Sequence, residues 1–221
     1  IGVAITDGEQ QIMLFSNEGK AIRFAETDVR SMGRSAKGVR GMRVTFAASV
    51  VEDDVETDTD SDDEDTSDSA FVSRIVSLVV VPETGEVLCA CANGYGKRTP
   101  VGDFPTKKRG GKGVIAIKTS ERNGELVGAV SIDESKELML ISDGGTLVRT
   151  RASEVATTGR NAQGVRLIRL GNEEILVGVV SVEAVEEDDF IEEVEGETLE
   201  VEKTNVNEAD IETDVNPSEE D

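Results

Sequence analysis

Short apolar segments alternate with polar turns along most of the chain, and this pattern predicts β-strands. The segments are six to eight residues long and rich in Val, Ile and Leu. None continues a 3.6-residue apolar repeat, so few helices are expected. Four related segments open successive units, at 1–6, 74–81, 126–132 and 175–182. A second apolar segment follows each of the first three, at 11–16, 86–92 and 137–142.

A glycine turn, a third strand, a basic loop and a fourth strand complete each predicted unit. Gly19, Gly94 and Gly145 mark the turns, where glycine removes the steric cost of a positive φ. The units align without a gap from this glycine through the strand after the loop. The loops have the sequences MGRSAKG (32–38), KKRGGKG (107–113) and TGRNAQG (158–164).

Four-stranded antiparallel units at this spacing predict an all-β fold, a β-pinwheel or propeller-like array with about three blades. The glycines that end the second and third loops are 51 residues apart, whereas the first and second are 75 apart. Removing an acidic insert of about 25 residues restores the period. The predicted divisions are a blade at 1–50, a disordered acidic insert at 51–70, a blade at 71–125, a blade with a closing strand at 126–182 and a disordered acidic tail at 183–221.

Acidic residues are concentrated outside the predicted blades. The formal net charge is −23, but 11 Asp and Glu lie in 52–68 and 18 lie in 183–221. The rest of the chain holds 22 Lys and Arg against 17 Asp and Glu. The acidic segments have too few apolar residues to fold alone, and a tail of this sign would compete with DNA for a nearby basic surface.

Lysine and arginine recur at equivalent positions of the three units, as expected of a protein that follows a long, regular polyanion such as DNA. The loop at 107–113 is the most basic, and its paired glycines would let backbone N–H groups approach a phosphate. A single such cation is more often a solvated surface residue, so the prediction rests on the repetition. The candidate DNA-binding residues are Lys107, Lys108, Arg109, Gly110, Gly111, Lys112, Gly113, Arg34, Lys37 and Arg160 in the loops, Arg23, Lys97, Arg98 and Arg149 on the third strand, and Arg43, Lys118 and Arg169 on the closing strand.

No catalytic or metal site is predicted from the sequence. It contains no His, and Cys89 and Cys91 are expected to be small core residues rather than a disulfide or a zinc site. Tyr95 is the only tyrosine, and because no partner arginine or carboxylate cluster is visible beside it, a turn or surface role is preferred over a DNA-cleaving one. Neither a membrane span nor a signal peptide is predicted. The chain begins with Ile1 in an expected strand, and we interpret it as a piece of a longer protein.

Several of these stretches resemble the C-terminal domain of the A subunit of bacterial DNA gyrase. The resemblance covers about 1–50 and 71–182 and is carried by 13–24, 93–118, the SERNG sequence at 120–124, and 145–165. It implies a six-bladed β-pinwheel whose basic perimeter wraps DNA, with this chain forming the later blades. KKRGGKG is similar to the family's QRRGGKG box, with Lys107 in place of Gln. The other two loops are more degenerate, with Gln163 in place of the last Lys.

The resemblance also implies a role within a larger enzyme, an ATP-dependent type II topoisomerase that introduces negative supercoils. The pinwheel would present wrapped DNA with a fixed crossing sense, while the cleaving tyrosine and the sites for ATP and Mg²⁺ would lie elsewhere, leaving no cofactor in this chain. The implied partners are double-stranded DNA, the gyrase B subunit, and a second A subunit, in an A2B2 heterotetramer in the bacterial cytoplasm, associated with the nucleoid.

Two other functions stay open at this point. One is the matching domain of the A subunit of topoisomerase IV, which decatenates DNA, although the GYGKRT and KKRGGKG stretches and the acidic tail favour gyrase. The other is a propeller-type protein-interaction scaffold in which the basic columns are incidental and binding depends little on salt. A stand-alone enzyme is the least favoured alternative.

Overall fold

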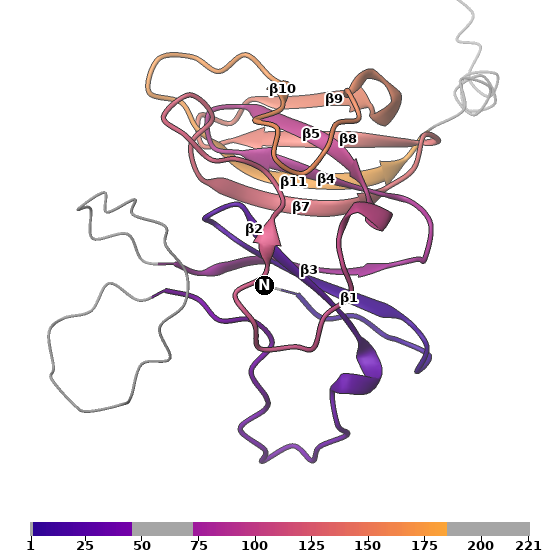
Figure 1. The fold of residues 1–221 in the computed structure, drawn as a ribbon. Coiled ribbons are helices and arrows are strands. Elements are labelled where there is room, and N and C mark those ends of the chain that lie inside the picture. The colour runs from indigo at the N-terminus through magenta and orange to yellow at the C-terminus, as the bar shows by residue number, and fades with distance from the viewer. Residues whose placement is uncertain (1, 46–72, 185–221) are drawn as a thin grey trace, which may run out of the picture. The chain divides into compact units, whose positions relative to one another are not determined.

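The computed structural model of the chain describes residues 2–45 and 73–184, which lie in one compact unit. In this part of the chain the secondary structure consists of short antiparallel strands and three single-turn 3₁₀ helices (Figure 1), which confirms the predicted all-β fold. The strands are β1 (Gln11–Ser16), β2 (Lys20–Ala25), β3 (Ile75–Val81), β4 (Glu86–Cys91), β5 (Tyr95–Pro100), β6 (Val114–Ile115), β7 (Leu126–Ile132), β8 (Lys136–Ser142), β9 (Leu147–Arg151), β10 (Val165–Arg166) and β11 (Leu176–Glu183). The helices are η1 (Glu26–Asp28), η2 (Val101–Asp103) and η3 (Ala152–Glu154).

Each four-stranded sheet takes strands from two successive units of the sequence. The first sheet has the order β3-β1-β2-β6 and the second has the order β10-β5-β4-β7. In the first sheet β1 and β2 belong to the first unit, whereas β3 and β6 are the opening and closing strands of the second. The blades are four-stranded and antiparallel as predicted, but the prediction that each unit folds on itself is wrong. The opening strand of a unit pairs with the second strand of the preceding unit, and the polar turn after it leads into the next sheet.

The first unit and the third sheet show the effect of this strand exchange at the two ends of the described array. The third sheet has three strands in the order β11-β8-β9. Residues 2–6 form no strand, and Val3 and Ile5 are 97% and 98% exposed. Their counterparts β3 and β7 pair with the second strand of the preceding unit, and the described residues contain no unit before the first. For the same reason the expected closing strand of the first unit is absent from 38–45.

Two closing segments dock on the turn of the preceding unit and form only two residues of strand each. The carbonyl of Gly19 accepts hydrogen bonds from the amides of Ala116 and Ile117, at 2.8 and 3.1 Å. The carbonyl of Gly94 accepts equivalent bonds from Leu167 and Ile168, at 2.8 and 3.2 Å. Glycine is needed at these turns for two reasons. Its φ is positive, and a Cβ at Gly94 would lie 2.7 Å from the carbonyl oxygen of Ile168.

The cores lie between sheets and are shared by them. One cluster joins Met13 and Phe15 of the first sheet to Val87 and Cys89 of the second, and Phe15 makes an edge-to-face contact with Phe104. A second cluster joins β4 to β8 and β11 of the third sheet. Cys89 and Cys91 are buried free thiols, which confirms their prediction as core residues. Burial raises the pKa of both thiols to about 12.

The predicted acidic insert at 51–70 and most of the predicted tail at 183–221 lie outside the described residues. The last described strand, β11, ends at Glu183, close to the predicted end of the blades at 182. No helix in the described part of the chain is long or apolar enough to cross a membrane.

Candidate nucleic-acid interface

The second and third basic loops contact the closing segments of the preceding units through backbone hydrogen bonds. The amide of Arg43 donates to the carbonyl of Gly111 at 2.9 Å, and the amide of Lys118 donates to the carbonyl of Ala162 at 3.2 Å. These two bonds join equivalent positions, so the second and third loops each lie against the closing segment of the unit before them. The three basic loops and their closing segments therefore form one continuous surface.

Two arginines at equivalent positions strengthen these contacts. Arg109 Nη1 donates to the carbonyl of Arg40 at 3.0 Å, and Arg160 Nη1 donates to the carbonyl of Ile115 at 3.1 Å. Arg109 Nε also donates to the carbonyl of Asp28 at 2.9 Å. The structure thus assigns this column a clamping role between units. Arg34, the equivalent residue of the first unit, is exposed.

Acidic residues are missing from this surface. The stretches 29–45, 104–120 and 155–170, here called the basic strip, contain no Asp or Glu and hold 13 Lys and Arg. Among the described residues, none of the ion pairs involves a cation of the strip. Their charges are therefore not neutralised by a neighbouring carboxylate. The exposed cations of the strip are Arg30, Arg34, Lys37, Arg40, Arg43, Lys107, Lys108, Lys112, Lys118, Arg166 and Arg169.

Two of the three arginines of the predicted third-strand column, Arg23 and Arg98, are used inside the fold, whereas Arg149 is exposed. Arg98 is buried, where its Nε donates to the carbonyl of Val155 at 2.7 Å and its Nη1 pairs with Glu86 at 2.8 Å. Arg23 Nη1 donates to the carbonyl of Val101 at 3.0 Å. Both arginines hold the 3₁₀ turn of the following unit. Arg149 at the same position pairs with Glu137 of the adjacent strand.

Lys97 is also inside the fold, although its sequence context predicts a DNA contact. The whole residue is buried, and Nζ donates to the carbonyls of Gly159 and Arg160, at 2.6 and 2.7 Å. Burial lowers the pKa of Lys97 from 10.5 to about 8. The ammonium group anchors the third basic loop from beneath and is not presented to solvent.

The loop glycines serve contact between units. Gly113 and Gly164 have φ of 81° and 85°. A Cβ at Gly113 would lie 2.5 Å from the carbonyl oxygen of Ala21, and one at Gly164 would lie even closer to that of Gly96. The amide of Gly110 donates to the carbonyl of Gly41. The expectation that the paired glycines open their amides to an anion is thus wrong at Gly110, because the preceding unit already uses that donor.

Four exposed arginines, Arg30, Arg40, Arg122 and Arg166, are not among the predicted DNA-binding residues, because none belongs to a column that is basic in all three units. Ile115 is the equivalent of Arg40 and Arg166 in the second unit, so that column is broken. The absence of acids over 155–170 is the signal that would have found Arg166. Tyr95 likewise has arginine partners, because Arg122 and Arg166 lie on its ring.

Within the described ranges no group of three or more Cys, Asp or Glu side chains is placed to hold a metal ion. The residues that the structure describes therefore do not form a site for the Mg²⁺ that the sequence resemblance implies for the whole enzyme. The chemistry that this surface offers is electrostatic and positional.

Antiparallel blades that exchange strands, with an acid-free basic strip across them, define a propeller-like repeat protein suited to a long polyanion. The chain belongs to the family described as DNA gyrase C-terminal domain, beta-propeller, whose model matches residues 10–54, 85–133 and 136–183.

Relatives and solved structures agree with this membership. The chain is 48% identical over 200 residues to the A subunit of DNA gyrase from Haemophilus influenzae, covering 89% of this chain and 23% of that protein. It is similar to a solved DNA gyrase A C-terminal domain, with a TM-score of 0.64 and 26% identity over 80% of this chain and 52% of that one. The fold is also similar to that of a topoisomerase IV C-terminal domain, with a TM-score of 0.65 and 20% identity over 82% of this chain and 49% of that one. The chain thus spans about a quarter of the gyrase subunit that it matches.

Proposed function

We propose that the chain is the DNA-binding and DNA-wrapping part of a gyrase A subunit. The observation that carries this proposal is the basic strip, which has no acidic residue and runs without a break across three units. Duplex DNA carries about one negative charge per 1.7 Å of helix axis, and its contacts release counterions. Cations on one continuous surface suit such a partner better than they suit a small anion.

The strip supports contacts to the DNA backbone rather than to particular bases. Its exposed side chains are Lys and Arg on loops and short segments, and the glycines between them are used to pack successive units. Phosphate contacts fix the position of a duplex without reading its sequence. Bending a site of 20–30 base pairs costs about 1–6 kcal/mol, which many such contacts must offset.

In the whole protein, this bending would support negative supercoiling by an ATP-dependent type II topoisomerase. The partners would be the gyrase B subunit and a second A subunit, in an A2B2 heterotetramer of the bacterial cytoplasm and nucleoid. The B subunit would supply ATP hydrolysis, and the remainder of the A subunit would supply strand cleavage. The high identity to the gyrase A subunit over most of the chain supports this assignment. Decatenation by topoisomerase IV remains the second candidate, supported by the likeness in fold.

A salt series on a duplex of about 40 base pairs tests the binding proposal. The variant changes Lys107, Lys108 and Lys112 to Gln, which leaves the clamp Arg109 in place. The slope of log affinity against log salt is expected to become shallower by about 2–3, because each phosphate contact contributes about 0.9. The matched control changes Arg74, Lys136 and Arg151 to Gln, three cations outside the strip, and its slope is expected to stay near that of the parent.

Equal slopes in the variant and the control would show that the strip does not contact phosphates. Weak binding that ignores salt in all three proteins would favour a protein-interaction scaffold instead. For the whole enzyme, we expect the same substitutions, made in the full-length protein, to reduce supercoiling of relaxed plasmid. A full-length parent protein that decatenates DNA but does not supercoil relaxed plasmid would favour topoisomerase IV.

A further inference from the structure

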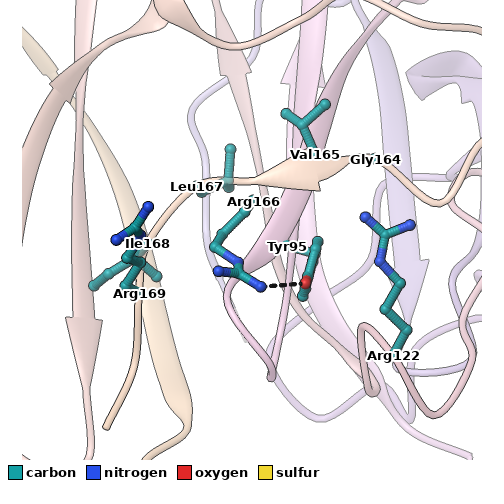
Figure 2. Close-up of a pocket in the computed structure, with 8 residues that line it drawn as sticks. All are labelled: Tyr95, Arg122, Gly164, Val165, Arg166, Leu167, Ile168 and Arg169. Carbon is teal, nitrogen blue, oxygen red and sulfur yellow. Dashed lines mark hydrogen bonds between the residues drawn. The ribbon is translucent and has the colours of Figure 1, made fainter.

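A hollow of about 570 Å³ lies where the closing segments of the second and third units meet (Figure 2). It is lined by Tyr95 at the start of β5, by Arg122 in the turn before β7, and by residues 164–169. Three of these side chains are arginines and none is acidic. A concave surface that collects positive charge in this way favours an anion.

Tyr95 orders two of the three arginines. The guanidinium carbon of Arg122 lies 4.6 Å from the ring centroid, and that of Arg166 lies 5.4 Å from it. Arg166 Nη2 also donates to the Tyr95 hydroxyl at 2.9 Å, and Figure 2 shows the ring between the two arginines. Hydrogen bonds from Arg166 and then Arg122 lower the pKa of the phenol. Because stacking holds these guanidinium groups in place, they lose less side-chain entropy when they bind a ligand.

Among the described residues, the arginines of the hollow are not paired with a carboxylate. In the described part of the chain, no ion pair involves Arg122, Arg166 or Arg169. An adjoining hollow contains Glu174, but that carboxylate accepts hydrogen bonds from the Ser142 hydroxyl and from the Gly171 amide. Guanidinium groups without a carboxylate partner are suited to a phosphate, which they bind through paired N–H donors.

Among the junctions that the structure describes, this arrangement of residues occurs at one. Lys20 is the equivalent of Tyr95 in the first unit, where it pairs with Glu18 at 2.9 Å and lies across from Ile115. Glu173 occupies the position equivalent to Arg122 after the third closing segment. The hollow therefore adds a specific feature to the repeating strip.

The hollow continues the basic strip. Arg166 and Arg169 belong to the strip, and Arg122 Nη1 contacts Gln163 Oε1 at 3.5 Å, beside the end of the third loop. A duplex that follows the strip would pass over these side chains. This continuity favours a phosphate of the DNA backbone over a small free anion.

We propose that Tyr95, Arg122 and Arg166 form a seat for one backbone phosphate of duplex DNA, with Arg169 at its edge, and that this seat fixes the duplex at the junction of the second and third units. The proposal deepens the proposed function and rests on it, because the seat needs a duplex already bound along the strip.

The test uses the full chain and a salt series on the same 40-base-pair duplex. The variant changes Arg122 and Arg166 to Gln, and its control changes Arg74 and Arg151 to Gln, so the change of charge is identical. The variant is expected to bind roughly tenfold more weakly than the control, with a salt slope smaller by about 1. Tyr95→Leu is expected to weaken binding more than Tyr95→Phe, which keeps the stacked ring.

The proposal is overturned if the Arg122 and Arg166 variant matches its control while the Lys107, Lys108 and Lys112 variant still loses affinity, since the duplex then follows the strip but bypasses the hollow. It is also overturned if the variant loses only the binding of inorganic phosphate. Failure of the parent to bind DNA at all would instead remove the proposed function.

Discussion

At the scale of single residues, one sequence column has two different physical roles. Arg98 and Arg149 occupy the same position of successive units. The Arg98 side chain is 8% exposed and tied to a carboxylate and a carbonyl of other elements, whereas the Arg149 side chain is 44% exposed and pairs only with Glu137. The difference arises because the described residues provide a following unit for Arg98 to hold and none for Arg149.

Replacing these two arginines by Met should therefore have unequal effects. Arg98→Met leaves Glu86 without its cationic partner and is expected to lower the free energy of unfolding by about 3 kcal/mol. Arg149→Met removes an exposed pair and should cost less than about 1 kcal/mol. Urea denaturation of the two variants at neutral pH measures both values. Similar losses in the two proteins would contradict the structural role of Arg98.

Lys97 gives a residue-scale prediction about pH. Its pKa is near 8 in the folded chain and 10.5 in the unfolded chain, so the unfolded state binds more protons between these values. Stability contributed by this group therefore rises with pH across that window, by about 1 kcal/mol between pH 8 and 9. The two cysteines oppose the rise increasingly from about pH 8, because their pKa is raised from 9.0 to about 12 on folding and they bind protons more tightly in the folded state.

The measurement is the free energy of unfolding at pH 7, 8 and 9 for the parent and for Lys97→Met. The parent should gain on the variant between pH 8 and 9. The neutral amine retains two N–H donors for the carbonyls of Gly159 and Arg160, so the loop should stay anchored throughout. Parallel pH profiles of the two proteins would show that Lys97 is not buried as described.

At the scale of elements, glycine is required where the closing segment of one unit packs against the preceding unit. Gly38, Gly113 and Gly164 are equivalent, and all three have a positive φ. A Cβ at Gly113 or Gly164 would overlap a carbonyl oxygen of the preceding unit, whereas a Cβ at Gly38 would meet nothing within 4 Å. The alignment alone suggests equal requirements for glycine, and the structure separates them.

Alanine at these positions should separate the backbone cost from the contact cost. Gly38→Ala is expected to cost about 1 kcal/mol, for the positive φ alone. Gly113→Ala and Gly164→Ala should cost about 1–3 kcal/mol more, because the closing strand must move away from its neighbour. Thermal or urea unfolding of the three variants gives the comparison. An equal cost at all three positions would show that the closing segments are loosely packed.

The strands themselves could be predicted from apolar periodicity, because β1, β4, β7 and β8 each bury one or both faces. Their partners could not be predicted, since a polar turn before β4 or β8 permits pairing within a unit as well as with the preceding one. The loop cations were found because they repeat. The burial of Lys97 could not be predicted, because Lys next to Arg on a strand is typical of an exposed position. Only the fold shows that the third loop covers this side chain. Arg122 was missed because its position is basic in only one unit.

At the scale of the whole described unit, the sheets are expected to unfold together. The first core cluster needs side chains from the first two sheets, and the second cluster needs side chains from the last two. Strand exchange adds backbone pairing across the same boundaries. A sheet that opened alone would break the core that it shares with its neighbour and the backbone pairing between successive units.

Cysteine labelling tests this cooperativity. Cys89 and Cys91 are buried in the core shared by the first two sheets, and their raised pKa suppresses the reactive thiolate. The free energy of opening, measured from labelling rates at increasing urea, should equal the free energy of unfolding measured by circular dichroism. Faster labelling than global unfolding permits would show that the first sheet opens independently.

The exchange of strands has a consequence for how such chains change in length. Each four-stranded sheet of the described unit combines the two middle strands of one period with the opening and closing strands of the next, so a tandem duplication of 51 residues leaves these sheets complete wherever its boundaries fall. A deletion of one full period is equally harmless to the interior. A duplication of half a period would instead leave two sheets with mismatched strands. Duplications and deletions in this architecture are therefore restricted to whole periods, but their boundaries can lie anywhere within a period.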